Sequence, residues 1–104
     1  MAPNTMSEMY KNLEEFLSSY FHQDWMEDAS SSMGIVEKYL SEWPSNEARA
    51  ALQELHSLLS IQNDGDVQSI VTKMGCYFNP SSEGYESFAE WMKAAEKEMD
   101  RVLN

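Results

Sequence analysis

The sequence contains few of the residues from which metal sites are built. Its 104 residues include only two histidines, His22 and His56, and one cysteine. Structural zinc normally takes four Cys, His or carboxylate ligands at short spacings, and no such group occurs here. Asp64-Gly65-Asp66 matches only the start of a calcium loop, because the later acidic ligands and the closing glutamate are out of register. We therefore expect no metal and no other cofactor.

The single cysteine, Cys76, excludes an intramolecular disulfide and fits a reducing compartment. No apolar run approaches the roughly 20 residues that a membrane helix needs. The N-terminal stretch MAPNTMSEMYK also lacks the basic start and apolar block of a signal peptide. We therefore expect a soluble cytoplasmic protein.

Basic residues are scarce as well. Seven Lys and Arg stand against eighteen Asp and Glu, which gives a formal net charge of −11. A field of this sign repels phosphate backbones, so direct nucleic-acid binding is not expected. The same field attracts basic partners, including proteins that themselves bind nucleic acid. Solubility alone is the plainer explanation of the charge, and composition does not decide between the two.

Strand-like alternation is hard to find, whereas apolar residues recur at the three- and four-residue spacing of helices. We predict an all-α fold, a compact bundle of about five helices that forms one domain over residues 1–104. The predicted apolar stripes span residues 6–21, 36–43, 48–59, 67–74 and 88–102.

Caps and breakers set the predicted helix boundaries. Thr5-Met6-Ser7-Glu8 has the capping-box pattern for the first helix. Pro44 ends the second helix, and Ser45 is a suitable N-cap for the third. Asn63-Asp64-Gly65 predicts a turn, and Gly75 predicts a left-handed C-terminal cap on the fourth helix. The last helix is expected to fray at its C-terminal end.

The segment Tyr20-Phe21-His22-Gln23-Asp24-Trp25 (YFHQDW) combines aromatic and titratable residues. If the first helix continued at about 100° per residue, Asp24 would fall within its apolar face. An isolated buried charge is costly, so either the helix ends near His22 or hydrogen-bond donors hold Asp24. Asp24-Trp25-Met26-Glu27 is a D-x-x-E capping pattern that supplies such donors. This interpretation places Trp25 against the core and His22 at the edge.

Two other interpretations of these residues stay open. The YFHQDW segment could serve as a binding surface. A small enzyme could use His22, Asp24 and Cys76, because a thiol near a histidine can act as a nucleophile. Cysteine is also among the side chains most often buried as a small hydrophobe, and the neighbours Tyr77 and Phe78 favour burial.

YFHQDW and the later segment Gly75-Cys76-Tyr77-Phe78-Asn79-Pro80 (GCYFNP) together resemble the motif pair of bacterial contact-dependent growth inhibition immunity proteins. A tryptophan in the terminal helix, here Trp91, completes the resemblance, which covers about residues 13 to 95. Phe78 stands where that family usually has tyrosine. We expect the motif residues to hold the fold: Tyr20, Phe21, His22, Asp24, Trp25, Gly75, Cys76, Tyr77, Pro80 and Trp91.

The resemblance implies a cytoplasmic inhibitor with no catalytic activity. Such a protein binds the C-terminal toxin domain that a neighbouring cell delivers, and neutralises it. Toxins of these systems are commonly nucleases, often acting on tRNA, and a nuclease has a basic substrate cleft. The charge of −11 suits such a partner. The alternatives are an acidic helical adaptor for another basic protein, or the small enzyme.

The resemblance does not locate the toxin-binding surface. We therefore select acidic positions near predicted helix ends as candidates, because exposed carboxylates can meet a basic cleft. These toxin-binding candidates are Glu27, Asp28, Glu37, Glu42, Asp64, Asp66, Glu83 and Glu86.

Overall fold

The computed structural model describes residues 9–104, apart from the side chain of Asp64. Within this range the chain forms α-helices and two single 3₁₀ turns, with no strand, which confirms the predicted all-α fold. The predicted capping box at residues 5–8 lies outside the described residues. The elements in chain order are α2 (Lys11–Tyr20), η1 (Trp25–Glu27), α3 (Ser32–Glu42), α4 (Ser45–Ile61), α5 (Asp64–Lys73), η2 (Pro80–Glu83) and α6 (Phe88–Leu103).

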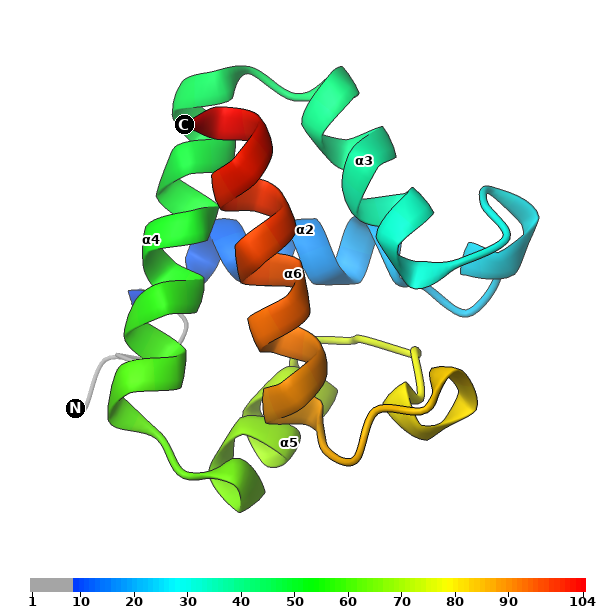
Figure 1. The fold of residues 1–104 in the computed structure, drawn as a ribbon, viewed down its shortest axis with the longest axis vertical. Coiled ribbons are helices and arrows are strands. Elements are labelled where there is room, and N and C mark those ends of the chain that lie inside the picture. The colour runs from blue at the N-terminus through cyan, green and yellow to red at the C-terminus, as the bar shows by residue number, and fades with distance from the viewer. Residues whose placement is uncertain (1–8) are drawn as a thin grey trace, which may run out of the picture.

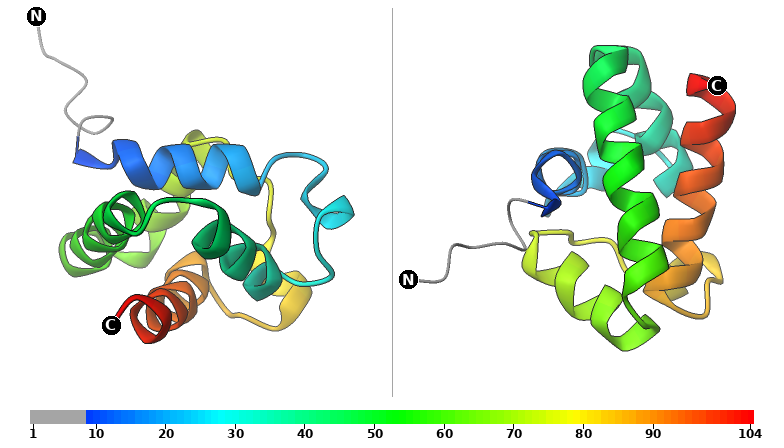
Figure 2. Two further views of the ribbon diagram at one scale, coloured as in Figure 1. Left: turned by 90° about the horizontal axis from the view of Figure 1, so that it is seen from above. Right: turned by 90° about the vertical axis from the view of Figure 1, so that its left-hand side faces the viewer.

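The two longest helices, α4 and α6, lie side by side and run in opposite directions (Figure 1). α2 crosses behind them, while α3 and α5 pack against different parts of α6 (Figures 1 and 2). The apolar faces of these helices enclose one core. Its largest fully buried side chains are Trp91, Tyr10, Tyr39, Phe16, Phe21, Phe78, Leu13, Leu17, Ile35, Leu55, Leu58 and Met92.

The predicted ends of two helices, α3 and α5, are confirmed. α3 begins at Ser32, after the N-cap Ser31, whose hydroxyl accepts a hydrogen bond from the Gly34 amide at 3.1 Å. It ends at Glu42, before Pro44, as the missing proline amide requires. Gly75 has φ +94°, the left-handed conformation predicted at the end of α5.

Other predicted boundaries are wrong. Ser45 is the first residue of α4, and Pro44 holds the N-cap position, so the serine hydroxyl does not cap this helix. Asn63-Asp64-Gly65 follows the end of α4, as predicted, but Asp64 and Gly65 are helical instead of forming a turn. The Asn63 side chain accepts from the Asp66 amide at 2.9 Å and so caps α5, which begins at Asp64. The first and last predicted apolar stripes also include exposed residues, because Met9 and Val102 are each 48% exposed.

The prediction that the last helix frays at its C-terminal end is wrong. α6 remains helical to Leu103, because Arg49 of α4 donates hydrogen bonds to the Leu103 carbonyl and, at 2.7 Å, to Asn104 Oδ1. In the described part of the chain, no helix has both the length and the apolar character that a membrane span requires.

Candidate functional site

The two sequence motifs meet at one corner of the fold. α2 ends at Tyr20, and the Phe21 carbonyl accepts a hydrogen bond from the Tyr77 amide at 2.8 Å. Phe78 then points into the core, with its ring centroid 5.3 Å from that of Trp25 and 4.5 Å from that of Trp91. We call the buried rings of Phe21, Trp25, Phe78 and Trp91 the motif cluster.

Burial of the motif cluster confirms that Trp25 packs against the core. Trp25 is 8% exposed, and Phe21 and Trp91 are fully buried with their rings edge-on at 5.0 Å. Such aromatic pairs add roughly 0.5–1.5 kcal/mol beyond the area they bury. The inner side of both motifs therefore stabilises the fold.

A polar network that the sequence did not reveal lies beside the motif cluster. The buried Ser32 hydroxyl accepts a hydrogen bond from Trp91 Nε1 at 3.1 Å and donates to Glu83 Oε1 at 2.5 Å. The Ser32 amide donates to Glu83 Oε2 at 2.9 Å. Glu83, from 51 residues away, thus satisfies an N-terminal amide of α3. Because Glu83 and Ser32 are far apart in the sequence, no local capping pattern could predict this contact.

The outer side of the first motif is arranged by His22. The Asp24 amide donates to His22 Nδ1 at 3.1 Å, and His22 Nε2 lies 3.2 Å from Asp28 Oδ2. Because Nδ1 accepts a hydrogen bond, the neutral ring carries its proton on Nε2. The Nε2–H group then donates a hydrogen bond to the Asp28 carboxylate. With 40% of its side chain exposed, His22 lies at the edge of the fold, as predicted.

The predicted D-x-x-E cap is wrong. The Asp24 side chain makes no capping hydrogen bond, and its carboxylate is exposed. Asp24 has φ −105° and ψ 27°, outside the extended conformation that aims an N-cap side chain at its helix. The carboxylate does not need to be buried, because α2 ends at Tyr20 with Phe21 as its C-cap, which confirms the alternative that the helix ends near His22.

Cys76 is 7% exposed, and burial raises the pKa of its thiol to about 12. A thiol must lose its proton to act as a nucleophile, so this environment opposes catalysis. The His22 ring nitrogens meanwhile bond to Asp24 and Asp28. His22, Asp24 and Cys76 are therefore not arranged as an activated nucleophile and base.

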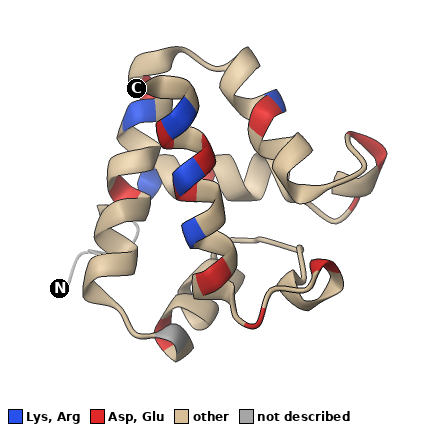
Figure 3. Cartoon of the chain, in the orientation of Figure 1, with Lys and Arg blue, Asp and Glu red and all other residues tan. Residues whose placement is uncertain are grey.

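Four of the acidic candidates lie on two loops at one side of the molecule. Glu27 and Asp28 belong to the η1 loop, while Glu83 and Glu86 belong to the η2 loop (Figures 1 and 2). We call residues 22–31 and 76–87 the loop face. Glu83 of its second part bonds to Ser32, which directly follows the first part. Figure 3 shows that these loops carry Asp and Glu without Lys or Arg.

The remaining candidates lie elsewhere. Glu42, at the end of α3, accepts hydrogen bonds from the Tyr20 hydroxyl at 2.6 Å and from Lys38 Nζ at 3.2 Å. These two donors, the tyrosine first, hold the pKa of the Glu42 carboxyl below its usual value. Glu37 lies close enough to Glu98 and Arg101 of α6 to influence the pKa of both.

The start of α5 borders the loop face. Gly65 and Gln68 line a hollow of about 260 Å³ together with Glu86 and Phe88. The exposed candidate Asp66 directly follows Gly65, a residue that lines this hollow. The side chain of the candidate Asp64 lies outside the described part of the structure.

The candidates also differ in whether their carboxylates are engaged. Within residues 9–104, the side chains of Glu27, Asp66 and Glu86 have no hydrogen-bond or ion-pair partner. Glu83 and Asp28, by contrast, are bonded inside the fold to Ser32 and His22. A free carboxylate can meet a partner without first breaking an internal bond.

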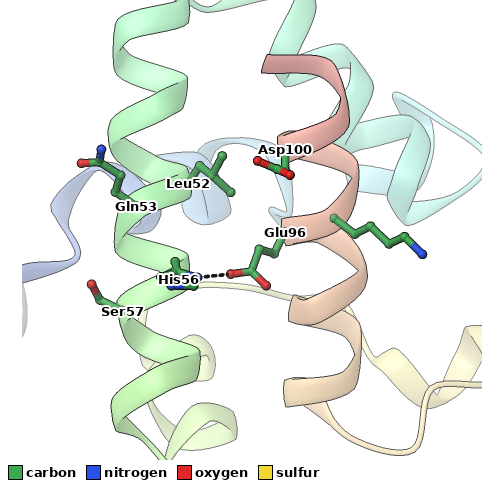
Figure 4. Close-up of a pocket in the computed structure, with 7 residues that line it drawn as sticks. Leu52, Gln53, His56, Ser57, Glu96 and Asp100 are labelled. Carbon is green, nitrogen blue, oxygen red and sulfur yellow. Dashed lines mark hydrogen bonds and ion pairs between the residues drawn. The ribbon is translucent and has the colours of Figure 1, made fainter. Parts of the chain in front are cut away.

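A groove of about 780 Å³ lies between α4 and α6. His56 Nδ1 and Glu96 Oε2 approach to 2.8 Å across it (Figure 4). The other lining residues are Leu52, Gln53, Ser57, Lys97 and Asp100. Four of the seven basic residues, Arg49, Lys93, Lys97 and Arg101, also belong to these two helices. The same two helices also carry six Asp and Glu, so the groove lies among charges of both signs, and none of the acidic candidates lines it.

Comparisons with known proteins agree with the arrangement of the fold. Residues 9–99 match the model of a protein family described as CdiI immunity protein. The chain is also similar to a chain in the crystal structure of a CdiA-CT/CdiI complex from Y. kristensenii 33638. That similarity has a TM-score of 0.79 and 25% sequence identity, and it covers 88% of this chain and 98% of the other. No curated protein matches this chain.

Proposed function

This chain belongs to the CdiI immunity protein family, and on that premise we propose that it binds and neutralises the C-terminal toxin domain of a contact-dependent growth inhibition system. The observation that carries the proposal is the family match over residues 9–99. The structural similarity to a toxin–immunity complex supports it. The proposed immunity domain comprises residues 1–104, acts in the cytoplasm and has no catalytic activity of its own.

We further propose that the toxin domain is basic and is a nuclease, with tRNA as one candidate substrate. A net charge of −11 suits a partner whose cleft is built for phosphates. The proposed contact is the loop face, where Glu27 and Glu86 present free carboxylates. The α4–α6 groove is less suitable, because four Lys and Arg offset most of the charge of the six Asp and Glu on these helices, whereas the loop face has no basic residue.

Protection of living cells tests this proposal. The toxin domain encoded beside this gene would be expressed from an inducible promoter, with or without the immunity protein. We expect growth to continue only in the presence of the immunity protein. Growth arrest in cells that contain soluble, folded protein would contradict the function. A toxin domain from an unrelated system provides the specificity control, since its action should be unaffected.

A further inference from the structure

Met26 is the most exposed large apolar side chain in the described part of the chain. It is 70% exposed, more than Tyr77 at 64% or Ile61 at 63%. Single exposed apolar residues are common on protein surfaces, so exposure alone carries no function. The backbone beneath Met26 and the charges beside it set this residue apart.

The η1 turn holds Met26 away from the core. A 3₁₀ turn has about three residues per turn, so consecutive side chains point in very different directions. Trp25 points inward and is 8% exposed in the motif cluster, which leaves the next side chain facing outward. The Glu27 amide donates to the Asp24 carbonyl and the Asp28 amide to the Trp25 carbonyl, both at 3.0 Å. The turn is therefore fixed before any partner arrives.

His22 fixes the turn from its other side. The ring accepts from the Asp24 amide and donates to the Asp28 carboxylate, so it joins the residues that flank η1. Binding costs less conformational entropy when the contacting segment is already ordered. An apolar side chain on such a turn is suited to insertion into a partner.

Charge specifies the kind of partner. Asp24, Glu27 and Asp28 are exposed next to Met26 in the chain, and no Lys or Arg occurs between Lys11 and Lys38. A surface that accepts Met26 must therefore place its apolar recess among positive charges. An exposed ion pair changes affinity little, whereas burial of a Met side chain is enough to change Kd by about 10-fold or more. In such a contact Met26 would supply affinity and the carboxylates would supply orientation.

We propose that Met26 is an apolar anchor of the toxin interface, inserted into an apolar recess that Lys or Arg side chains border on the toxin domain. This inference rests on the proposed function and specifies the contact through which it operates. It gives this corner of the fold two sides. The motif cluster on the inner side builds the core, and Met26, which directly follows the first motif, meets the partner on the outer side.

The affinity of purified Met26→Ala for the cognate toxin domain tests the anchor, with Ile61→Ala as the matched control. Ile61 ends α4, on the opposite side of the molecule from η1 (Figures 1 and 2). We expect Met26→Ala to raise Kd by about 10-fold or more, from the lost burial. Met26→Leu, which keeps apolar volume, and Ile61→Ala should each stay within about threefold of wild type. A Met26→Ala protein that melts like wild type and binds equally well would overturn the inference.

A second pair of variants tests the basic border of the recess. Glu27→Lys places a positive charge beside Met26, and Glu47→Lys makes the same change on the first turn of α4. We expect Glu27→Lys to weaken binding about 10-fold more than Glu47→Lys, because like charges across an interface repel. Equal effects would contradict the proposed border. A wild-type protein that does not bind would overturn the proposed function itself, whereas normal wild-type binding with unaffected variants would overturn only this contact.

Discussion

The carboxylate of Glu83 accepts hydrogen bonds from both the amide and the hydroxyl of Ser32. The side chain of Glu86, three residues later, has no partner among the described residues. Both are acidic residues on the η2 loop, and composition gives them the same weight as toxin-binding candidates. Their surroundings separate them. Glu83 is bound within the fold, and Glu86 is available to a partner.

Glu83→Gln should lower the free energy of unfolding by about 1–2 kcal/mol, because a carboxamide offers one acceptor where Ser32 presents two donors. Urea denaturation measures this change. Glu86→Gln is the matched control and should stay within about 0.5 kcal/mol of wild type. Equal stability of the two variants would show that the Ser32–Glu83 contact does not support the fold.

Cys76 gives a chemical prediction at the same scale. Because burial raises the pKa of the thiol to about 12, the native protein should react only slowly with iodoacetamide near pH 8. Denaturant should restore rapid labelling, since the unfolded thiol regains its ordinary pKa. Mass spectrometry of the alkylated protein measures both rates. Rapid labelling of the folded chain would reopen the nucleophile hypothesis.

At the scale of helices, α2 depends on a residue of α4. Glu54 Oε1 accepts hydrogen bonds from the amides of Asn12 and Leu13 at 2.8 and 2.9 Å, and Oε2 accepts from Asn12 Nδ2 at 2.6 Å. These amides belong to the first turn of α2 and have no partner within that helix. A negative charge at this position also interacts favourably with the helix dipole.

Glu54→Ala should therefore destabilise the protein by about 1–3 kcal/mol, through the loss of charge-assisted hydrogen bonds to an N-terminal turn. Glu15→Ala removes the same charge from an exposed position on α2 and should change stability by less than about 0.5 kcal/mol. Thermal unfolding followed by circular dichroism compares the two. The proposed capping role fails if Glu54→Ala melts at the wild-type temperature.

Helix positions followed from the sequence because apolar periodicity and Pro44 act locally. Caps were less predictable. Ser45 and Asp24 both had suitable side chains, but Pro44 displaced the first from the N-cap position, and the backbone of Asp24 was not extended. Glu54 and Glu83 cap helices that lie 41 or more residues away along the chain. Only the folded structure brings those groups together.

The same limit applies to the candidate site. Counting carboxylates could not separate Glu83, which is bonded inside the fold, from Glu27, which is free. Met26 lies outside every predicted apolar stripe. Its exposure depends on two features of the structure, the end of α2 at Tyr20 and the burial of Trp25. The site depends on how short segments turn, and turns respond to distant contacts as much as to local sequence.

At the scale of the whole molecule, charge is unevenly distributed. Basic side chains concentrate on α4 and α6, whereas the loop face has none (Figure 3). A basic toxin domain would therefore approach this molecule with a preferred orientation. Long-range attraction of this kind raises the association rate more than it changes the lifetime of the complex.

Stopped-flow association with the cognate toxin domain tests the effect of this charge distribution. Raising NaCl from about 0.05 M to about 0.5 M should lower the association rate constant about 10-fold, because the Debye length falls below interface dimensions. The dissociation rate constant should change by less than about threefold. An association rate that ignores salt would contradict electrostatic steering and leave the family membership untouched.

The most direct test of the central claim is calorimetric titration of the purified chain with the purified toxin domain encoded beside its gene. Membership of the CdiI family predicts a stable complex, with Kd of about 10⁻⁷ M or tighter, and loss of toxin activity in the mixture. The absence of binding heat and of a complex on gel filtration at about 10 μM, with both proteins folded, would contradict the claim.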